Sequence, residues 1–88
     1  MIVKAIYRRN LKMTEGKVAS QVAHAVVGLS LAFKPSKIIV LKVTDKKFGE
    51  LAEQNDCYLQ EDGGFTEVNK GEVTAAAWVE NEPAQVRS

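Results

Sequence analysis

Residues 2–7 alternate loosely between hydrophobic and polar positions and are rich in strand-forming residues, so they predict a first β-strand. Thr14 is placed to cap the first turn of a helix that we expect to run to about Leu31. Pro35 cannot continue that helix, because it lacks a backbone donor and clashes with the preceding turn. The nearly continuous hydrophobic run at 38–43 predicts a second strand that is buried on both faces.

The second half of the chain predicts shorter elements. Thr44 can cap a helix over residues 45–54. The inner side of this helix would carry Phe48, Leu51 and Ala52. Residues 57–60 and 73–79 predict strands that can form an antiparallel pair, and residues 65–68 are strand-like. Because the first two strands are joined through a helix, they should be parallel with a right-handed crossover.

Length and composition fit this pattern. The 88 residues suffice for one α/β domain over residues 1–88, with a small mixed four-stranded sheet packed with helices. Cys57 is the only cysteine and His24 the only histidine, which excludes a zinc or iron–sulfur centre built within one chain. A lone cysteine favours a reducing compartment. Because hydrophobic runs are short and the N-terminus is strand-like, we interpret the protein as cytoplasmic.

The charge is distributed unevenly along the chain. Residues 1–47 hold ten Lys or Arg and two acids, whereas residues 48–88 hold two Lys or Arg and nine acids. The first part therefore carries a net charge of +8 and the second −7. This asymmetry indicates a surface that meets a polyanion, although an ordinary charged surface is the alternative.

The predicted first helix carries a narrow polar stripe. At about 100° per residue, its four members fall within roughly 60° of one another. They are Lys17, Gln21, His24 and Gly28. The stripe is compatible either with a functional face or with a solvated face, and a single histidine is more typical of a hydrogen-bonded structural residue.

The start of this helix is a candidate anion site. Its backbone N–H groups and dipole favour an anion, and Gly16 stands there. The cations close to it in sequence are Arg8, Arg9, Lys12 and Lys17. Together they could hold phosphate, although neither a Walker loop nor a GxGxxG fingerprint is present.

The second candidate is the turn formed by residues 62–66, Asp-Gly-Gly-Phe-Thr. Its glycines, Gly63 and Gly64, permit a close approach of the backbone to a ligand. Asp62 follows a short strand and is placed to project into a cleft, and Thr66 can hydrogen-bond the turn or Asp62 itself. The alternative is an ordinary loop, because turns favour both Asp and Gly.

These pieces together resemble the type 2 peptidyl-tRNA hydrolases, the archaeal and eukaryotic type. The resemblance runs through RRNLKM at 8–13, GKVASQVAHA at 16–25, IIVLKV at 38–43, DGGFT at 62–66 and KGEVT at 70–74. The helix segment is close to the specific family signature GKxxAQxxHA, and the pieces lie in the family's order. This resemblance implies hydrolysis of the ester that joins a peptide to the 3′ ribose of tRNA, without metal or cofactor.

The resemblance also implies site residues. Lys17, Asp62 and Thr66 match the family's proposed catalytic set, and Gln21 and His24 match its signature neighbours. In ester hydrolysis Asp62 would orient or deprotonate water, Thr66 would orient Asp62 or donate to substrate, and Lys17 would stabilise an oxyanion or the terminal phosphate. Gln21 would bind a substrate carbonyl, and His24 would hold the helix against the Asp62 turn.

The expected substrate is peptidyl-tRNA, whose phosphates would follow the basic first half of the chain. That binding should weaken steeply as the salt concentration rises. The predicted substrate-binding and tRNA-binding residues are Arg8, Arg9, Lys12, Gln21, His24 and Gly64.

Several positions depart from the family pattern. Asn10 stands where the family has Asp, and Phe65 and Glu67 stand where Arg and Gln are common. The connector at 31–37 is too short for the family's extra helix, and no C-terminal helix is predicted. The sheet would then be partly uncovered, and a homodimer could cover it. A non-catalytic module that binds tRNA ends or a protein is therefore the alternative to a hydrolase.

Overall fold

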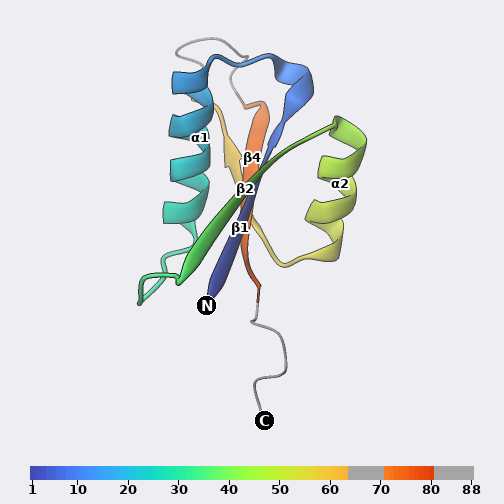
Figure 1. Ribbon diagram of the computed structural model, residues 1–88. Coiled ribbons are helices and arrows are strands. Elements are labelled where there is room, and N and C mark those ends of the chain that lie inside the picture. Colours follow the sequence, from blue (N-terminus) through green and yellow to red (C-terminus); the bar gives the residue numbers. More distant parts are fainter. Residues whose placement is uncertain (64–70, 81–88) are drawn as a thin grey trace.

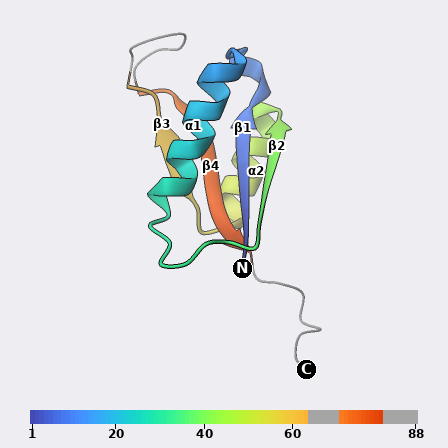
Figure 2. The same cartoon turned by 60° about the vertical axis from the view of Figure 1, so that its left-hand side comes forward.

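Residues 1–63 and 71–80 are described by the computed structural model. The elements along the chain are strand β1 (Ile2–Arg8), the 3₁₀ turn η1 (Arg9–Leu11), helix α1 (Glu15–Gly28), strand β2 (Lys37–Val43), helix α2 (Asp45–Gln54), strand β3 (Tyr58–Glu61) and strand β4 (Val73–Glu80). Figures 1 and 2 show three layers, in which the sheet separates α1 on one face from α2 on the other. The predicted α/β class with a mixed four-stranded sheet is confirmed.

The strands lie in the order β2-β1-β4-β3, so that β1 and β4 occupy the centre of the sheet. β1 and β2 are parallel, in a register that runs from Ile2 opposite Lys37 to Arg8 opposite Val43, as predicted. β4 is antiparallel to both β1 and β3, which confirms the expected antiparallel pairing of the last two strands. The strand-like stretch predicted at 65–68 lies outside the described residues.

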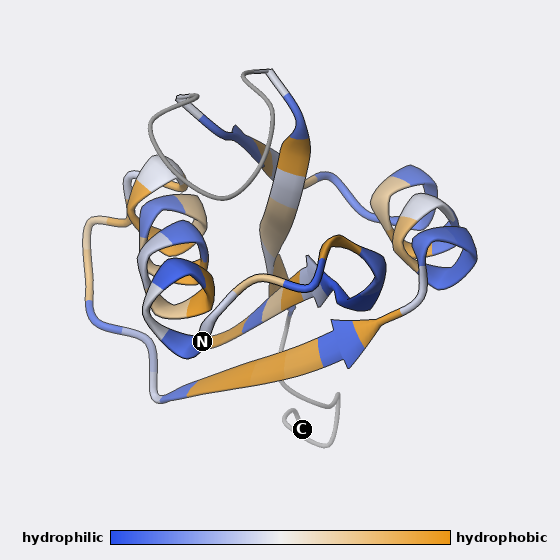
Figure 3. Ribbon diagram, turned by 90° about the horizontal axis from the view of Figure 1, so that it is seen from above, coloured by the Kyte–Doolittle hydropathy of each residue, from blue (hydrophilic) through white to orange (hydrophobic). Residues whose placement is uncertain are grey.

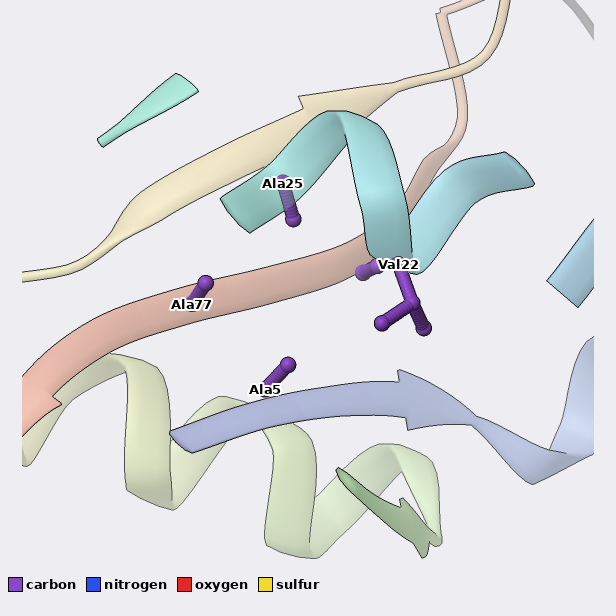
Figure 4. Packing of buried hydrophobic residues seen from close by; sticks show 5 residues of the cluster. Ala5, Val22, Ala25 and Ala77 are labelled. Atoms are coloured by element: carbon purple, nitrogen blue, oxygen red, sulfur yellow. The ribbon is translucent and has the colours of Figure 1, made fainter. Parts of the chain in front are cut away.

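Two groups of buried hydrophobic side chains join the helices to the sheet. The group under α1 comprises Ala5, Val22, Ala25, Ala75 and Ala77 (Figure 4). The group under α2 comprises Ile6, Phe48, Ala76 and Trp78, with Leu51 packed against it. Because the first group is mostly alanine, the backbone of α1 can lie close to the sheet. The second group confirms Phe48 and Leu51 on the inner side predicted for α2.

The two predicted helix caps differ in the structure. The Thr44 hydroxyl accepts a hydrogen bond from the Lys47 amide at 3.2 Å, so this residue caps α2 as expected. Thr14 stands at the N-cap position of α1 in extended backbone, but its side chain makes no capping hydrogen bond. The helix therefore begins where the sequence predicts, without the hydroxyl contact that was expected.

Helix α1 ends at Gly28, three residues before the predicted end. The Leu29 amide donates to the Val26 carbonyl oxygen at 3.1 Å, which tightens the last turn. Ser30 then adopts a left-handed backbone with φ of 53°, which turns the chain away. The predicted stop at Pro35 is not what ends the helix.

Strand β2 corrects a second expectation, because it forms an edge of the sheet rather than a strand buried on both faces. Ile38, Val40 and Leu41 are 49%, 45% and 42% exposed. Helix α1 lies over β1, β4 and β3, and Figure 3 shows the hydrophobic strand that leads into α2 running along the rim of the molecule. Hydrophobicity alone predicted burial, but burial also needs layers that extend over the strand.

The position of Gly28 provides a test of how α1 packs on β3. Replacing a helical glycine by alanine normally stabilises a helix by about 1 kcal/mol. An added Cβ at Gly28 would lie 2.6 Å from Cζ of Tyr58, whereas at Gly49 in α2 it would meet nothing within 4 Å. We expect Gly49→Ala to raise the free energy of unfolding by up to about 1 kcal/mol and Gly28→Ala to give no gain.

Denaturant titration measures both changes. In a Tyr58→Ala background, Gly28→Ala should recover the gain that it lacks in the parent. An equal gain in both backgrounds would contradict the packing of Tyr58 on α1.

Candidate functional site

A buried ion pair joins α1 to the end of β3. The Nζ atom of Lys17, in the first turns of α1, donates to Oδ1 of Asp62, the residue that follows β3. Only 10% of the Lys17 side chain and 1% of the Asp62 side chain are exposed. Helix α1 lies over β3 and β4, and this packing brings together the two candidates that the sequence placed 45 residues apart.

The burial of this pair has an energetic cost. Two charges removed from water lose hydration, and their mutual attraction compensates for it only in part. A hydrophobic pair of similar size would stabilise so small a domain at least as well. The two buried charges lie where β3 ends and the segment that leads to β4 begins. We therefore interpret them as a candidate catalytic or binding site rather than as a stabilising contact.

A second buried polar pair lies one turn further along α1. Gln21 is 6% exposed and Thr74, in β4, is fully buried. The Thr74 hydroxyl donates to Oε1 of Gln21 at 2.5 Å, and the Gln60 carbonyl oxygen lies 3.3 Å from the same hydroxyl. Among residues 1–63 and 71–80, no acceptor bonds to Nε2 of Gln21. The carboxamide therefore keeps two N–H donors next to the ion pair.

A β-bulge explains how Thr74 reaches Gln21. Gln60 pairs with Ala75 and Glu61 pairs with Val73, so that Thr74 is an extra residue on β4. Simple alternation would place Thr74 on the α2 face, together with Ala76. The bulge instead turns its hydroxyl to the α1 face, where Gln21 lies. Sequence reasoning missed Thr74 as a site residue because a bulge breaks the period of two on which strand patterns depend.

The backbone also holds Asp62 in place. Its N–H donates to the Glu72 carbonyl oxygen at 2.9 Å, and the Gly71 N–H donates to the Asp62 carbonyl oxygen at 3.0 Å. Gly71 has a φ of +86°, which glycine adopts without the strain that a side chain would add. These bonds join the two ends of the segment 63–70.

Of the four cations predicted to bind phosphate, two are paired with carboxylates and two are exposed. The Arg8 guanidinium bonds both oxygens of Asp45, at 2.9 and 3.0 Å, and Oε2 of Glu72 at 2.7 Å. Lys17 is paired with Asp62. Arg9 and Lys12 are exposed in the connector that leads into α1.

Asn10 has a structural role at the start of α2. Its Oδ1 accepts a hydrogen bond from the Asp45 amide at 3.0 Å. A neutral amide therefore satisfies one of the amides that a helix leaves unpaired at its start, and the carboxylate of Asp45 supplies the charge that the helix dipole favours there.

Of the remaining sequence candidates, only His24 lies within the described residues. His24 is exposed on α1, and no hydrogen bond joins it to any residue within 1–63 or 71–80. The part of the turn at 64–66, against which His24 is expected to hold α1, lies outside the described residues, so this role stays a prediction. Gly64 and Thr66 lie outside the described residues.

The described residues offer neither a metal site nor an activated thiol. No group of three or more His, Cys, Asp or Glu side chains within 1–63 and 71–80 could hold a metal ion. Burial raises the pKa of the Cys57 thiol, which keeps it protonated and poorly nucleophilic. No helix in the same residues is long and hydrophobic enough to cross a membrane.

Comparison with known proteins identifies a family for this chain. The family described as peptidyl-tRNA hydrolase PTH2 matches residues 1–87 of the chain. This chain belongs to that family. A relative from Methanopyrus kandleri named peptidyl-tRNA hydrolase is 37% identical over 87 residues, and the match covers 78% of this chain and 75% of the relative. Membership of the peptidyl-tRNA hydrolase PTH2 family confirms the resemblance seen in the sequence motifs.

The Gln21–Thr74 contact gives a testable stability effect. Thr74→Val keeps the side-chain shape but removes the hydroxyl donor to Gln21. Leaving the buried Oε1 without this donor should lower the free energy of unfolding by about 1–3 kcal/mol, measured by urea denaturation. In a Gln21→Met background, the same substitution should cost clearly less. Additive effects of the two changes would contradict the contact.

Proposed function

We propose that this protein hydrolyses the ester bond between a peptide, or an N-blocked amino acid, and the 3′ ribose of tRNA, releasing free tRNA. The observation that carries the proposal is the buried contact of Lys17 with Asp62, in a chain of the peptidyl-tRNA hydrolase PTH2 family. Ester hydrolysis needs a water molecule, a base or acceptor for its proton, and stabilisation of the tetrahedral oxyanion. The candidate site offers a group for each need.

In the proposed mechanism, the Asp62 carboxylate orients the attacking water and accepts its proton. It returns this proton to the 3′ oxygen of the ribose as the acyl–oxygen bond breaks, which releases tRNA with a free hydroxyl. The Lys17 ammonium carries three N–H donors, one of which is directed to Asp62, and it stabilises the charge that develops on the ester oxygen. The Nε2 donors of Gln21 bind a carbonyl of the substrate, while Thr74 holds the amide in one orientation. Thr66 remains a proposed partner of Asp62.

For the tRNA part of the substrate, we propose Arg9 and Lys12 as the phosphate contacts. Both are exposed in the segment between β1 and α1, whereas Arg8 is bonded to carboxylates. Contacts of this kind release counterions, so they make affinity salt-dependent. Gly64 and His24 remain proposed substrate contacts. Because the substrate belongs to translation, we place the protein in the cytoplasm.

The activity is tested with N-acetyl-aminoacyl-tRNA, by measuring the release of the blocked amino acid. We expect cleavage by the parent protein and a fall in kcat of about 100- to 1,000-fold in Lys17→Met and Asp62→Asn. Glu53→Gln, an acid-to-amide change on the exposed side of α2, should keep the parent rate. Arg9→Gln should raise KM and leave kcat unchanged.

The single variants need a check on folding, because each leaves one buried charge without its partner. Lys17→Met/Asp62→Asn removes both charges together and should fold while lacking activity, which circular dichroism can verify. A parent protein that binds tRNA but never releases the amino acid would support the non-catalytic binding module. Undiminished activity in the double variant would refute the site assignment.

We also propose a homodimer that covers the open edge of the sheet. The hydrophobic side chains Ile38 and Val40 on β2 are about half exposed, and Val27 and Phe33 on the α1 side are 75% and 77% exposed. An edge strand of this kind presents unpaired backbone groups beside hydrophobic surface. A second copy of the chain supplies a matching edge by symmetry.

Analytical ultracentrifugation over a range of concentrations tests this proposal. The parent should sediment as a dimer, and Val40→Lys should weaken the dimer at least about tenfold, which corresponds to about 1.4 kcal/mol. Leu59→Lys provides the control, because Leu59 is similarly exposed, at 46%, on the opposite edge strand. A monomeric parent, or equal effects of the two substitutions, would speak against the β2 interface.

A further inference from the structure

Arg8 bridges three parts of the fold from the end of β1. Its Nε and Nη2 atoms donate to the two oxygens of Asp45, in the first turn of α2, at 2.9 and 3.0 Å. Its Nη1 donates to Oε2 of Glu72 at 2.7 Å and to the carbonyl oxygen of Val73 at 2.8 Å. Only 18% of the Arg8 side chain is exposed. The bonds to Glu72 and Val73 are partly buried, whereas the two bonds to Asp45 are exposed. A planar guanidinium is suited to such a set of simultaneous bonds.

Glu72 connects Arg8 to Asp62, because its side chain bonds Arg8 and its backbone bonds Asp62. Glu72 accepts the Asp62 N–H at its carbonyl oxygen, at 2.9 Å. A chain of direct contacts therefore runs from Arg8 through Glu72 to Asp62 and on to Lys17. Each link is a hydrogen bond or an ion pair.

The start of β4 needs this support for a physical reason. The bulge at Thr74 interrupts the regular pairing with β3 immediately after Val73, so fewer ladder hydrogen bonds hold the strand there. Arg8 bonds the residues before the bulge, and β1 supplies a rigid base for its side chain. Thr74 lies next to this bonded segment and contacts Gln21, so both buried polar pairs depend on where the start of β4 lies.

Asp45 is the other acid partner of Arg8. The hydrogen bonds from Arg8 lower the pKa of the Asp45 carboxyl below its ordinary value, so the pair stays ionised at neutral pH. Asp45 itself makes no contact with Glu72 or Asp62 within the described residues. Asp45 therefore provides a matched control for Glu72. Both acids bond Arg8, but only Glu72 is also bonded to Asp62.

We propose that Arg8 is a positioning residue that places Asp62 against Lys17 through Glu72, an inference that rests on the proposed hydrolase function. The guanidinium takes no part in binding phosphate. Its effect on the reaction is indirect, because a small displacement of a catalytic group is sufficient to slow a reaction substantially.

The test compares Arg8→Gln and Glu72→Ala with Asp45→Ala, using N-acetyl-aminoacyl-tRNA. Arg8→Gln and Glu72→Ala should lower kcat about tenfold or more with little change in KM, because the site is misplaced while the exposed tRNA contacts remain. Asp45→Ala should lower kcat less than about twofold. Arg8→Lys should restore the activity only in part, because an ammonium cannot make the same four bonds.

Amide hydrogen exchange measures the positioning without relying on activity. In Arg8→Gln, exchange at Asp62 and Gly71 should accelerate, while exchange in the middle of α1, at Val22 and Ala25, should stay as in the parent. Equal acceleration at all four amides would show a general loss of stability and overturn the proposal. Unchanged exchange at Asp62 together with unchanged kcat would overturn it as well.

The exchange measurement also separates this inference from the proposed function. If the parent protein fails to cleave the substrate, the proposed hydrolase function is wrong. Local acceleration at Asp62 and Gly71 in Arg8→Gln would then still support the coupling of Arg8 to Asp62, and its absence would refute that coupling.

Discussion

Strand β4 is the element on which the rest of the structure depends, because it is central in the sheet and carries helices on both faces. Its residues Ala75, Ala76 and Ala77 are fully buried, and their small side chains alternate between the α1 and α2 faces. Small residues in a central strand let the backbone of α1 approach the sheet closely. Gly28 extends the same close packing to the ring of Tyr58 on the neighbouring strand. The site at the other end of α1 exists because of this approach.

Burial of the two polar pairs lowers the stability that the thin core of this domain can reach. A domain of this size buries a smaller share of its surface than a larger one, so it has little stability to spare. It nevertheless buries an ammonium with a carboxylate, and a carboxamide with a hydroxyl, along one side of α1. Stability alone does not call for polar groups at these positions. Their position beside the turn that begins at Asp62 accords with the hydrolytic site that we propose.

The uneven charge along the chain acquires a different meaning once the fold is known. Three cations of the basic first half pair with acids of the second half, namely Lys4 with Glu80, Arg8 with Glu72, and Lys17 with Asp62. Two of these pairs arise because β1 lies beside β4 in the sheet. The hydrogen bond from Lys4 lowers the pKa of Glu80, which accords with this pairing. Part of the charge asymmetry thus stabilises contacts inside the molecule, while Arg9 and Lys12 stay exposed.

Local features of the sequence were enough to predict much of this protein. The Thr44 cap and the inner face at Phe48 identified α2, the helical crossover identified the parallel pair β1 and β2, and the motif order identified the family. Spacing on one helix together with the glycine turn also selected Lys17 and Asp62, which the fold brings into contact. These predictions succeeded because capping, periodicity and a helical crossover between two strands depend on short stretches of chain.

Only the tertiary structure decided the remaining features. Hydrophobicity measures whether a strand favours burial, but the strand order left β2 at an open edge. The orientation of Thr74 depends on a bulge, which exists only in the register between two strands. The acid partners of Arg8, Asp45 and Glu72, lie 37 and 64 residues along the chain, so the sequence alone did not show that its guanidinium bonds them. Each of these features depends on contacts between segments far apart in the chain, and no local pattern encodes them.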